Sequence, residues 1–378
     1  MPDYLERSLT PARGEASNYL LLTPGPLSTA QTVREAMLQD WCTWDKDYNE
    51  GVVTPIRRKL LELAGVDAGE YTTVLLQGSG TYCVEAAIGS AVRPAGKLLI
   101  ISNGAYGCRM GAIAACYKLN CEMIQLRETE LITGEVVEKA LDAHKDVTHV
   151  AMVHCETTTG ILNRLEEVGE VVKKYPVTFI VDAMSSFGGI PIDMKACGID
   201  FLVSSANKCI QGVPGFGFVL VSKDKMPACK GNARSLSLDL YDQWETMEKG
   251  NGKWRFTSPT HVVRAFYQAL ADLEREGGVE ARYRRYQQNN AILYEGMQAL
   301  GFTPLLPREM QSPVITSFLY PSADFDFQAF YDRLKRKGFV IYPGKISDAD
   351  TFRIGNIGDV KPGDMERLLY AIHETWNL

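Results

Sequence analysis

The chain has 378 residues, of which 46% are hydrophobic and 23% are charged, an ordinary composition for a globular protein. This length allows a large core and suggests two domains, or one large domain with a smaller cap. The net charge of −6, with acidic and basic residues interspersed, argues against a surface that binds nucleic acids or membranes.

The N-terminal residues 1–26 lack the basic and then apolar order of a secretory signal, and no apolar run approaches the length of a membrane span. We therefore expect a cytoplasmic protein without nucleic-acid or membrane partners. Residues 23–27, TPGPL, indicate a rigid turn and by themselves nothing more.

From about Tyr71 onward, short apolar runs alternate with helix-length segments. The runs cover residues 72–78, 97–104, 148–155, 177–183 and 200–207. This alternation is typical of parallel strands joined by crossovers, so it predicts an α/β fold with a mostly parallel sheet covered on both faces. One more run, residues 215–222, follows too closely for a helical crossover, and we expect it to pair antiparallel.

After Phe256 the pattern becomes that of amphipathic helices, and the basic and aromatic residues 282–286 are interpreted as a solvated helix face. Strand-like runs at 312–320, 338–344 and 351–358 precede a final helix at 365–376. The chain therefore divides, in this prediction, into an extension (1–17), a large α/β domain (18–284) and a smaller C-terminal α+β domain (285–378).

The nine cysteines are odd in number and form no CxxC pair, which is typical of reduced thiols rather than of disulfides or a zinc site. The histidines His144, His149 and His154 lack the spacing of a helical metal pair. We therefore expect no metal.

Ligands of open α/β sheets bind at the carboxyl ends of the strands, so polar residues at those ends are candidate site residues. Ser79, Gly80 and Thr81 follow the first run and open a helix, whose backbone N–H groups suit a phosphate. Glycine is common in such turns, and the third glycine of a dinucleotide-binding fingerprint is missing.

Asp182 and Lys208 end two later runs, and the segment between them is long enough for one crossover. Both side chains should therefore reach the same edge of the sheet, although Asp182 alone could equally be a helix N-cap. A phosphate-binding turn, a carboxylate and a lysine suit pyridoxal 5′-phosphate. The lysine would form the Schiff base, and the carboxylate would keep the pyridine nitrogen protonated.

Further residues at strand ends allow a functional and a structural interpretation. Tyr106 could stack on a cofactor ring or pack in a loop. The carboxylate and three hydroxyls of residues 154–160, HCETTTG, could bind a ring oxygen or only form a turn. Arg353 could bind a carboxylate or a phosphonate, or form a surface ion pair.

These motifs together resemble the 2-aminoethylphosphonate–pyruvate transaminase family, which belongs to the class V aminotransferases of the fold-type I pyridoxal phosphate enzymes. The resemblance runs from about Asn18 to near the C-terminus and rests on NYLLLTPGPL, CTWDKDYN, LLQGSGTYCVEA, SNGAYGCRM, HCETTTG, VDAMSSFGGIPID, SSANKCIQGVPGFGFV, SLSLDLY, GKWRFTSPTH, FVIYPGK and FRIGNIG. It implies the fold-type I architecture and pyridoxal 5′-phosphate as cofactor.

The resemblance also implies roles for single residues that bind the cofactor. Lys208 matches the Schiff-base lysine, and Asp182 matches the partner of the pyridine nitrogen. The phosphate turn is matched by Ser79, Gly80 and Thr81. Tyr106 stands in the place of the ring-stacking aromatic residue, and one of two hydroxyls, of Thr157 or of Thr158, contacts the cofactor.

For the substrate and the partner subunit, the resemblance implies three further residues. Arg353 matches the arginine that binds the acid group of the substrate, and Gly25 supplies backbone nearby. Thr257 matches a residue that reaches the cofactor phosphate of the neighbouring subunit, which implies a homodimer with shared active sites.

The implied reaction moves the amino group of 2-aminoethylphosphonate to pyruvate and gives phosphonoacetaldehyde and L-alanine, in phosphonate breakdown. The alternative is another class V transaminase, of the serine or alanine–glyoxylate type, with the same cofactor site. A cysteine desulfurase or selenocysteine lyase would need a nucleophilic cysteine in the C-terminal part, and none follows Cys229. A nicotinamide-dependent dehydrogenase or a non-catalytic ligand-binding protein is the alternative from a different class.

Overall fold

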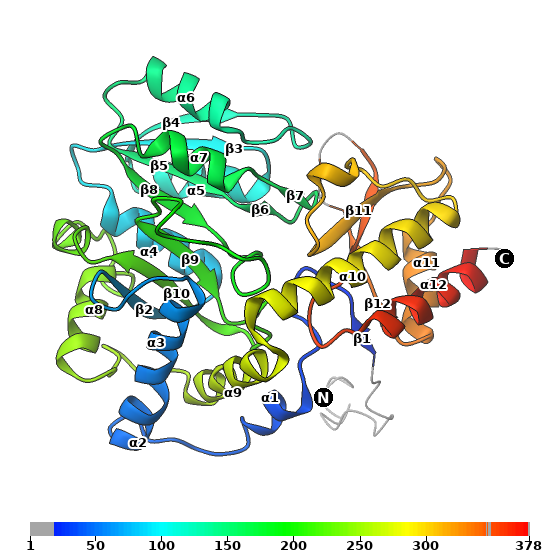
Figure 1. Cartoon of the computed structure of the whole chain (residues 1–378), viewed down its shortest axis with the longest axis horizontal. Helices are drawn as coiled ribbons and strands as arrows, with labels where there is room; N and C mark the ends of the chain where they lie inside the picture. Colours follow the sequence, from blue (N-terminus) through cyan, green and yellow to red (C-terminus); the bar gives the residue numbers. More distant parts are fainter. Residues whose placement is uncertain (1–18, 345, 347–348, 377–378) are drawn as a thin grey trace, which may run out of the picture.

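The computed structural model describes residues 19–344, 346 and 349–376. These residues form a central seven-stranded sheet with the strand order β2-β10-β9-β8-β5-β3-β4 (Figure 1). In that order the strands span Tyr71–Gly78, Gly215–Ser222, Phe201–Ser205, Thr178–Asp182, His149–Val153, Lys97–Ser102 and Asn120–Gln125. β10 is antiparallel to both of its neighbours and the other pairs are parallel, which confirms the antiparallel pairing predicted for residues 215–222.

Helices cover both faces of this sheet, because adjacent strand residues point to opposite sides and both sides are apolar. Leu99 and Leu202 belong to the core on one face, and Ile100 and Val203 to the core on the other. The first core also contains residues of α3 (Thr54–Leu63), α6 (Gly134–Ala143), α7 (Leu165–Val172) and α9 (Thr260–Glu276). The second contains residues of α4 (Gly80–Ala91), α5 (Ala105–Cys116) and α8 (Leu240–Lys249).

A smaller unit follows the long helix α10 (Gly278–Ala299), which runs between the two parts of the molecule in Figure 1. We call it the C-terminal unit. Its antiparallel sheet has the order β11-β14-β13, and β12 pairs in parallel with the N-terminal strand β1. The elements are β11 (Ile315–Leu319), α11 (Phe327–Arg336), β12 (Phe339–Val340), β13 (Tyr342–Pro343), β14 (Thr351–Gly355), α12 (Pro362–Trp376) and, from the N-terminus, β1 (Leu20–Leu21).

Short elements complete the described chain. They are α1 (Gln31–Glu35), α2 (Lys46–Tyr48), the π-helix η1 (Asn49–Val53), the hairpin of β6 (Cys155–Glu156) and β7 (Ile161–Leu162), and the 3-10 helices η2 (Met226–Cys229) and η3 (Arg308–Met310). None of the helices within the described ranges is long and apolar enough to cross a membrane.

The predicted domain boundary at residue 285 falls inside α10, which is continuous from Gly278 to Ala299. β1 lies in the segment predicted to belong to the large domain, but it pairs with β12 of the C-terminal unit. The division into domains stays a prediction, and the extension 1–17 lies outside the described residues.

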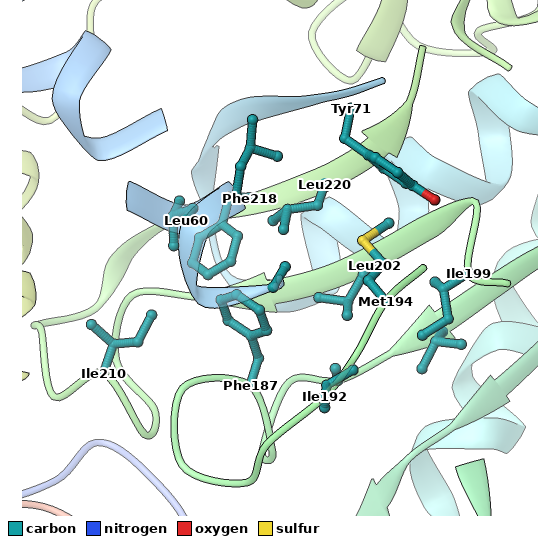
Figure 2. Packing of buried hydrophobic residues seen from close by; sticks show 14 of the residues in the cluster. Leu60, Tyr71, Phe187, Ile192, Met194, Ile199, Leu202, Ile210, Phe218 and Leu220 are labelled. Atoms are coloured by element: carbon teal, nitrogen blue, oxygen red, sulfur yellow. The ribbon is translucent and has the colours of Figure 1, made fainter. Parts of the chain in front are cut away.

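Two hydrophobic side chains anchor the loops that leave β8 and β9. Phe187, in the loop after β8, packs edge-on against Phe218 of β10, with ring centroids 5.6 Å apart. Ile210, in the loop after β9, belongs to the same core (Figure 2). Burial of such a side chain contributes about 1.5–3 kcal/mol. Both loops are therefore held against the core at the edge of the sheet where Asp182 and Lys208 lie.

Candidate active site

The carboxyl ends of β8 and β9 border a cavity of about 180 Å³ that also receives the N-terminal turns of α4 and α5. Parallel strands end at one edge of the sheet, and that is where ligands of such sheets bind. The structure brings six of the predicted residues together in the lining of this cavity: Ser79, Gly80, Thr81, Tyr106, Asp182 and Lys208.

The turn between β2 and α4 supplies helix N–H groups at the cavity. Ser79 is the extended N-cap residue of α4, and the helix begins at Gly80. The first N–H groups of a helix have no partner within the helix, so they are available to an anion. A Cβ atom on Gly80 would lie 2.3 Å from the sulfur of Met184, so a side chain here would require the Met184 side chain to move.

Asp182 is the last residue of β8 and is almost fully buried. Its Oδ1 accepts a hydrogen bond from the backbone N–H of Met184 at 2.8 Å. Turns follow β8 rather than a helix, so Asp182 is not a helix N-cap. Burial raises the pKa of Asp182 to about 6, and the nearby Glu156 acts in the same direction. A cationic hydrogen-bond donor in the cavity would therefore stabilise the carboxylate.

Lys208 lies three residues beyond the end of β9. Its Nζ donates a hydrogen bond to the backbone carbonyl of Pro24 at 2.6 Å. Burial lowers the pKa of Lys208 from its ordinary value of 10.5, although the neighbouring Asp182 opposes this effect. A lower pKa increases the fraction of neutral amine, which is the form that attacks a carbonyl.

The TPGP turn lies directly against Lys208. Gly25 has a φ of +128°, and a Cβ atom at this position would lie 2.9 Å from the Nζ atom of Lys208. Thr23 fixes the turn, because its hydroxyl donates to the carbonyl of Pro26 and accepts from the N–H of Gly25. Gly25, predicted near the substrate, is thus next to the lysine amine.

Glu156 is the carboxylate of residues 154–160, and it is fully buried. Its Oε2 accepts from the N–H of Tyr106 at 3.0 Å, and its Oε1 accepts from the N–H and the hydroxyl of Thr158. It therefore fixes the first turn of α5, and with it the position of the Tyr106 ring. The carboxylate predicted either to bind a ring oxygen or to form a turn thus holds the turn and the start of α5.

The hairpin turn after β6 distinguishes the two candidate hydroxyls. The hydroxyl of Thr158 donates to Glu156, whereas the buried hydroxyl of Thr157 has no hydrogen-bond partner among the described residues. A buried hydroxyl without a hydrogen-bond partner lowers the stability of the fold unless a bound ligand forms the missing hydrogen bond. Neither threonine lines the cavity in the protein alone.

Arg353 of β14 is brought to the hairpin turn from the C-terminal unit. It is 2% exposed, its Nη1 donates to the carbonyl of Thr157 at 2.9 Å, and its Nε donates to the carbonyl of Pro343 at 3.0 Å. Within the described ranges it forms no ion pair with a carboxylate, so the surface ion pair considered for it is absent there. The buried guanidinium retains N–H groups for an anionic ligand.

Thr257 does not lie at the cavity of its own chain. It lines a separate surface depression together with Thr43, Asn49 and Phe256. Of the predicted site residues, it is the one that the structure places on a different part of the surface.

The interpretation of residues 282–286 as a solvated helix face is wrong. Arg282 is 2% exposed and Tyr286 is fully buried. The Nη1 of Arg282 donates to the carbonyl of Cys209 at 2.7 Å, and its guanidinium pairs with Glu276. These α10 residues hold the backbone that follows Lys208. A local pattern could not reveal this, because the partner carbonyl is distant in the chain.

The donor set fits pyridoxal 5′-phosphate. Helix N–H groups and the hydroxyl of Thr81 suit the phosphate, and the buried Asp182 suits a protonated ring nitrogen. The partnerless hydroxyl of Thr157 is a buried donor without an acceptor among the described residues. Among the residues that the structure describes, no group of three or more histidine, cysteine, aspartate or glutamate side chains could hold a metal ion.

Comparisons with known proteins agree with this arrangement. The sequence profile of the family described as "Aminotransferase class-V" matches residues 51–347. The chain is 64% identical over 357 residues to a 2-aminoethylphosphonate–pyruvate transaminase of Bacteroides fragilis, covering 94% of this chain and 99% of the relative. It is 60% identical over 360 residues to the transaminase of the same name from Vibrio vulnificus, covering 95% and 98%.

The fold is also similar to solved structures. The crystal structure of an alanine–glyoxylate aminotransferase from Nostoc sp. superposes with a TM-score of 0.89 and covers 100% of this chain and 99% of that one. The sequence identity is 24%, so this similarity concerns the fold alone.

Proposed function

The chain belongs to the class V aminotransferase family, and on this premise we propose that it transfers the amino group of 2-aminoethylphosphonate to pyruvate. The products are phosphonoacetaldehyde and L-alanine. The observation that carries the proposal is the cavity that joins Lys208, Asp182 and the phosphate turn in a chain 64% identical to a transaminase of this name. A class V transaminase of the alanine–glyoxylate type has only the similarity of fold in its favour.

Pyridoxal 5′-phosphate, when bound, supplies an electron sink that makes the C–H bond beside the substrate nitrogen acidic. Lys208 would hold the cofactor through its amine. The same amine would be the acid–base group that moves a proton between the nitrogen-bearing carbon of the substrate and the cofactor. Asp182 keeps the ring nitrogen protonated, and its raised pKa suits a shared proton.

Two other residues hold the cofactor in this proposal. Tyr106 lies against the ring, in a position that Glu156 fixes through the N–H of Tyr106. Of the two candidate hydroxyls we favour that of Thr157, because it is buried without a partner among the described residues while Thr158 donates to Glu156.

Arg353 binds the acid group of either substrate in this proposal. A guanidinium fork matches both a phosphonate and a carboxylate, so one residue can serve both half-reactions. Its two hydrogen bonds to backbone carbonyls orient the fork without neutralising its charge. Gly25 lies against Lys208.

The function is tested by absorbance spectra of the purified holoenzyme. Addition of 2-aminoethylphosphonate alone should replace the band of the lysine-linked cofactor by that of the pyridoxamine form, and pyruvate should restore the first band. A band that does not respond would leave the cofactor site intact and refute the substrate. Glyoxylate tested in place of pyruvate examines the alternative transaminase.

Arg353→Ala should raise the KM for both 2-aminoethylphosphonate and pyruvate and lower kcat/KM by about 10²-fold or more, because a buried charge-assisted contact is lost. Steady-state kinetics with each substrate in turn measure this. Arg284→Ala removes an exposed arginine of α10 and serves as the control. An unchanged KM for both substrates would show that another residue binds the anion.

We further propose a homodimer in which Thr257 binds the cofactor phosphate of the neighbouring subunit. Thr257 lies away from its own cavity, and large apolar side chains are exposed around it: Trp44 is 78%, Leu236 75% and Phe256 54% exposed. These residues form one surface with Thr257, because Lys253 and Arg255 line the same depression. The Nζ of Lys253 lies over the Trp44 ring, and Arg255 donates to the carbonyl of Leu236. Exposed apolar groups of this size are typical of interfaces.

Subunit mixing tests the shared site. Thr257→Ala and Lys208→Ala chains should each be impaired alone, and unfolding and refolding them together should restore activity, because a mixed dimer contains one site with both native residues. Sedimentation of the wild-type chain should show a dimer. A fully active monomer, or mixtures without any recovery, would rule out the shared site. The cytoplasmic location and the role in phosphonate breakdown stay predictions.

A further inference from the structure

Arg109 is a cation in the cavity wall that the proposed reaction does not use. It belongs to the second turn of α5 and lines the cavity together with Ser79, Gly80 and Thr81. Its Nη1 donates a hydrogen bond to the hydroxyl oxygen of Thr81 at 3.0 Å. Within the described ranges it forms no ion pair with a carboxylate. Burial raises the pKa of Asp182 in the same cavity, and the charge of Arg109 opposes that effect.

The hydrogen bond between Arg109 and Thr81 has a defined direction. A guanidinium has only donors, so the hydroxyl of Thr81 can only accept from it. The single proton of that hydroxyl therefore remains for another acceptor. A donor that is charged also polarises the hydroxyl, which strengthens the bond that this proton forms.

Two contacts fix the side chain of Arg109 in this position. Its guanidinium carbon lies 4.8 Å from the centroid of the Tyr106 ring, and it reaches from α5 to the first turn of α4, which packs beside α5. A cation over an aromatic ring is favourable and limits the rotamers available. Arg109 thus stands where the N-termini of two helices meet, a region that already favours an anion.

We propose that Arg109 is a positioning residue for the phosphate group of the cofactor. It holds the oxygen of the Thr81 hydroxyl so that the hydroxyl proton is presented to a phosphate oxygen, and its charge offsets part of the phosphate charge. This inference rests on the proposed pyridoxal phosphate dependence. It concerns cofactor affinity rather than the chemical step, so it can be tested without turnover.

The first test compares pyridoxal 5′-phosphate with pyridoxal, which lacks the phosphate, by equilibrium dialysis. Arg109→Met should weaken the binding of pyridoxal 5′-phosphate about 10- to 100-fold, as expected for a lost charge-assisted contact, and leave pyridoxal unchanged. An equal loss of affinity for both ligands would show that Arg109 acts through the Tyr106 ring. Unchanged affinity for both ligands would show that Arg109 only links α5 to α4 and has a purely structural role. Both outcomes overturn the proposal.

A double-mutant cycle tests whether Arg109 acts through the hydroxyl. Thr81→Val removes the hydroxyl and keeps the shape of the side chain. In the Thr81→Val background, Arg109→Met should weaken pyridoxal 5′-phosphate binding much less than it does in the wild type, because the two residues act together. Fully additive losses would overturn the orienting role.

Arg234→Met is the matched control for folding effects. Arg234 donates from Nη1 to the carbonyls of Gly89 and Val92 at the other end of α4, away from the cavity. The Arg234→Met protein should be less thermally stable than the wild type and should bind pyridoxal 5′-phosphate with unchanged affinity. If it lost as much affinity as Arg109→Met, the Arg109 result would be a general effect of destabilising α4, and the proposal would be overturned. A wild-type chain that binds no pyridoxal 5′-phosphate would refute the proposed function itself, which distinguishes the two failures.

Discussion

Lys208→Ala is expected to eliminate both the absorbance band of the lysine-linked cofactor and turnover, with a loss of about 10⁴-fold or more, because one residue supplies the covalent attachment and the proton transfer. Absorbance spectra after incubation with pyridoxal 5′-phosphate, followed by an assay of alanine formation, measure both effects. The cofactor should still bind noncovalently, since the phosphate turn and Asp182 remain.

The lowered pKa of Lys208 adds a pH dependence to this prediction. Burial disfavours the charged amine, so the rate of covalent cofactor capture by the wild-type apoenzyme should rise with pH and reach half its maximum below pH 10.5. Lys195→Ala removes an exposed lysine that pairs with Glu70 on the surface, and its turnover should equal that of the wild type. Substantial turnover in Lys208→Ala would remove Lys208 from the mechanism.

Asp182→Asn should lower activity about 10²- to 10³-fold without destabilising the apoenzyme. The amide keeps the oxygen that accepts the N–H of Met184, but it cannot carry the negative charge that holds a proton on the ring nitrogen. Kinetics of each half-reaction and denaturant unfolding of the apoenzyme measure the two effects separately.

The raised pKa predicts the sign of the stability change. Burial raises the pKa of Asp182 from 3.8 to about 6, so as the pH rises the unfolded chain ionises first. The folded state should therefore lose about 2 kcal/mol of stability between pH 4 and pH 6, out of about 3 kcal/mol over the whole titration. The amide introduced by Asp182→Asn does not ionise. The apoenzyme of this variant should therefore match the wild type at pH 4 and be the more stable one at pH 7.

Asp200→Asn is the matched control for Asp182→Asn. Asp200 precedes β9 at the opposite edge of the sheet, where its Oδ2 accepts from the N–H of Phe179. We expect the Asp200→Asn variant to retain its activity. An apoenzyme of Asp182→Asn that lost stability in proportion to activity would assign Asp182 a structural role.

Much of the large α/β part is determined by local sequence. Apolar runs bounded by glycine and polar residues predict the parallel strands, because a strand covered on both faces must be apolar throughout. The short connection before residues 215–222 likewise predicts the antiparallel β10, since no crossover fits into it. The edge strand β4 was not predicted, because its partly exposed side chains do not form an apolar run.

The positions of Lys208, Asp182 and the phosphate turn at one edge of the sheet also follow from the sequence, because parallel strands all end at that edge. Arg353 and Gly25 reach the site from other parts of the chain. Their proximity depends on how the C-terminal unit and the TPGP turn pack against Thr157 and Lys208. No spacing in the sequence encodes such a contact.

The hydrogen-bond partners were decided by the tertiary structure alone. The sequence could not separate Thr157 from Thr158, whereas the structure engages one hydroxyl with Glu156 and leaves the other without a partner among the described residues. Residues 282–286 look like a solvated face, but Arg282 is buried against the carbonyl of Cys209. The sequence determines which chemical groups stand at strand ends. Which of them are buried together, and therefore which pKa values shift and which donors remain free, depends on the packing of distant segments.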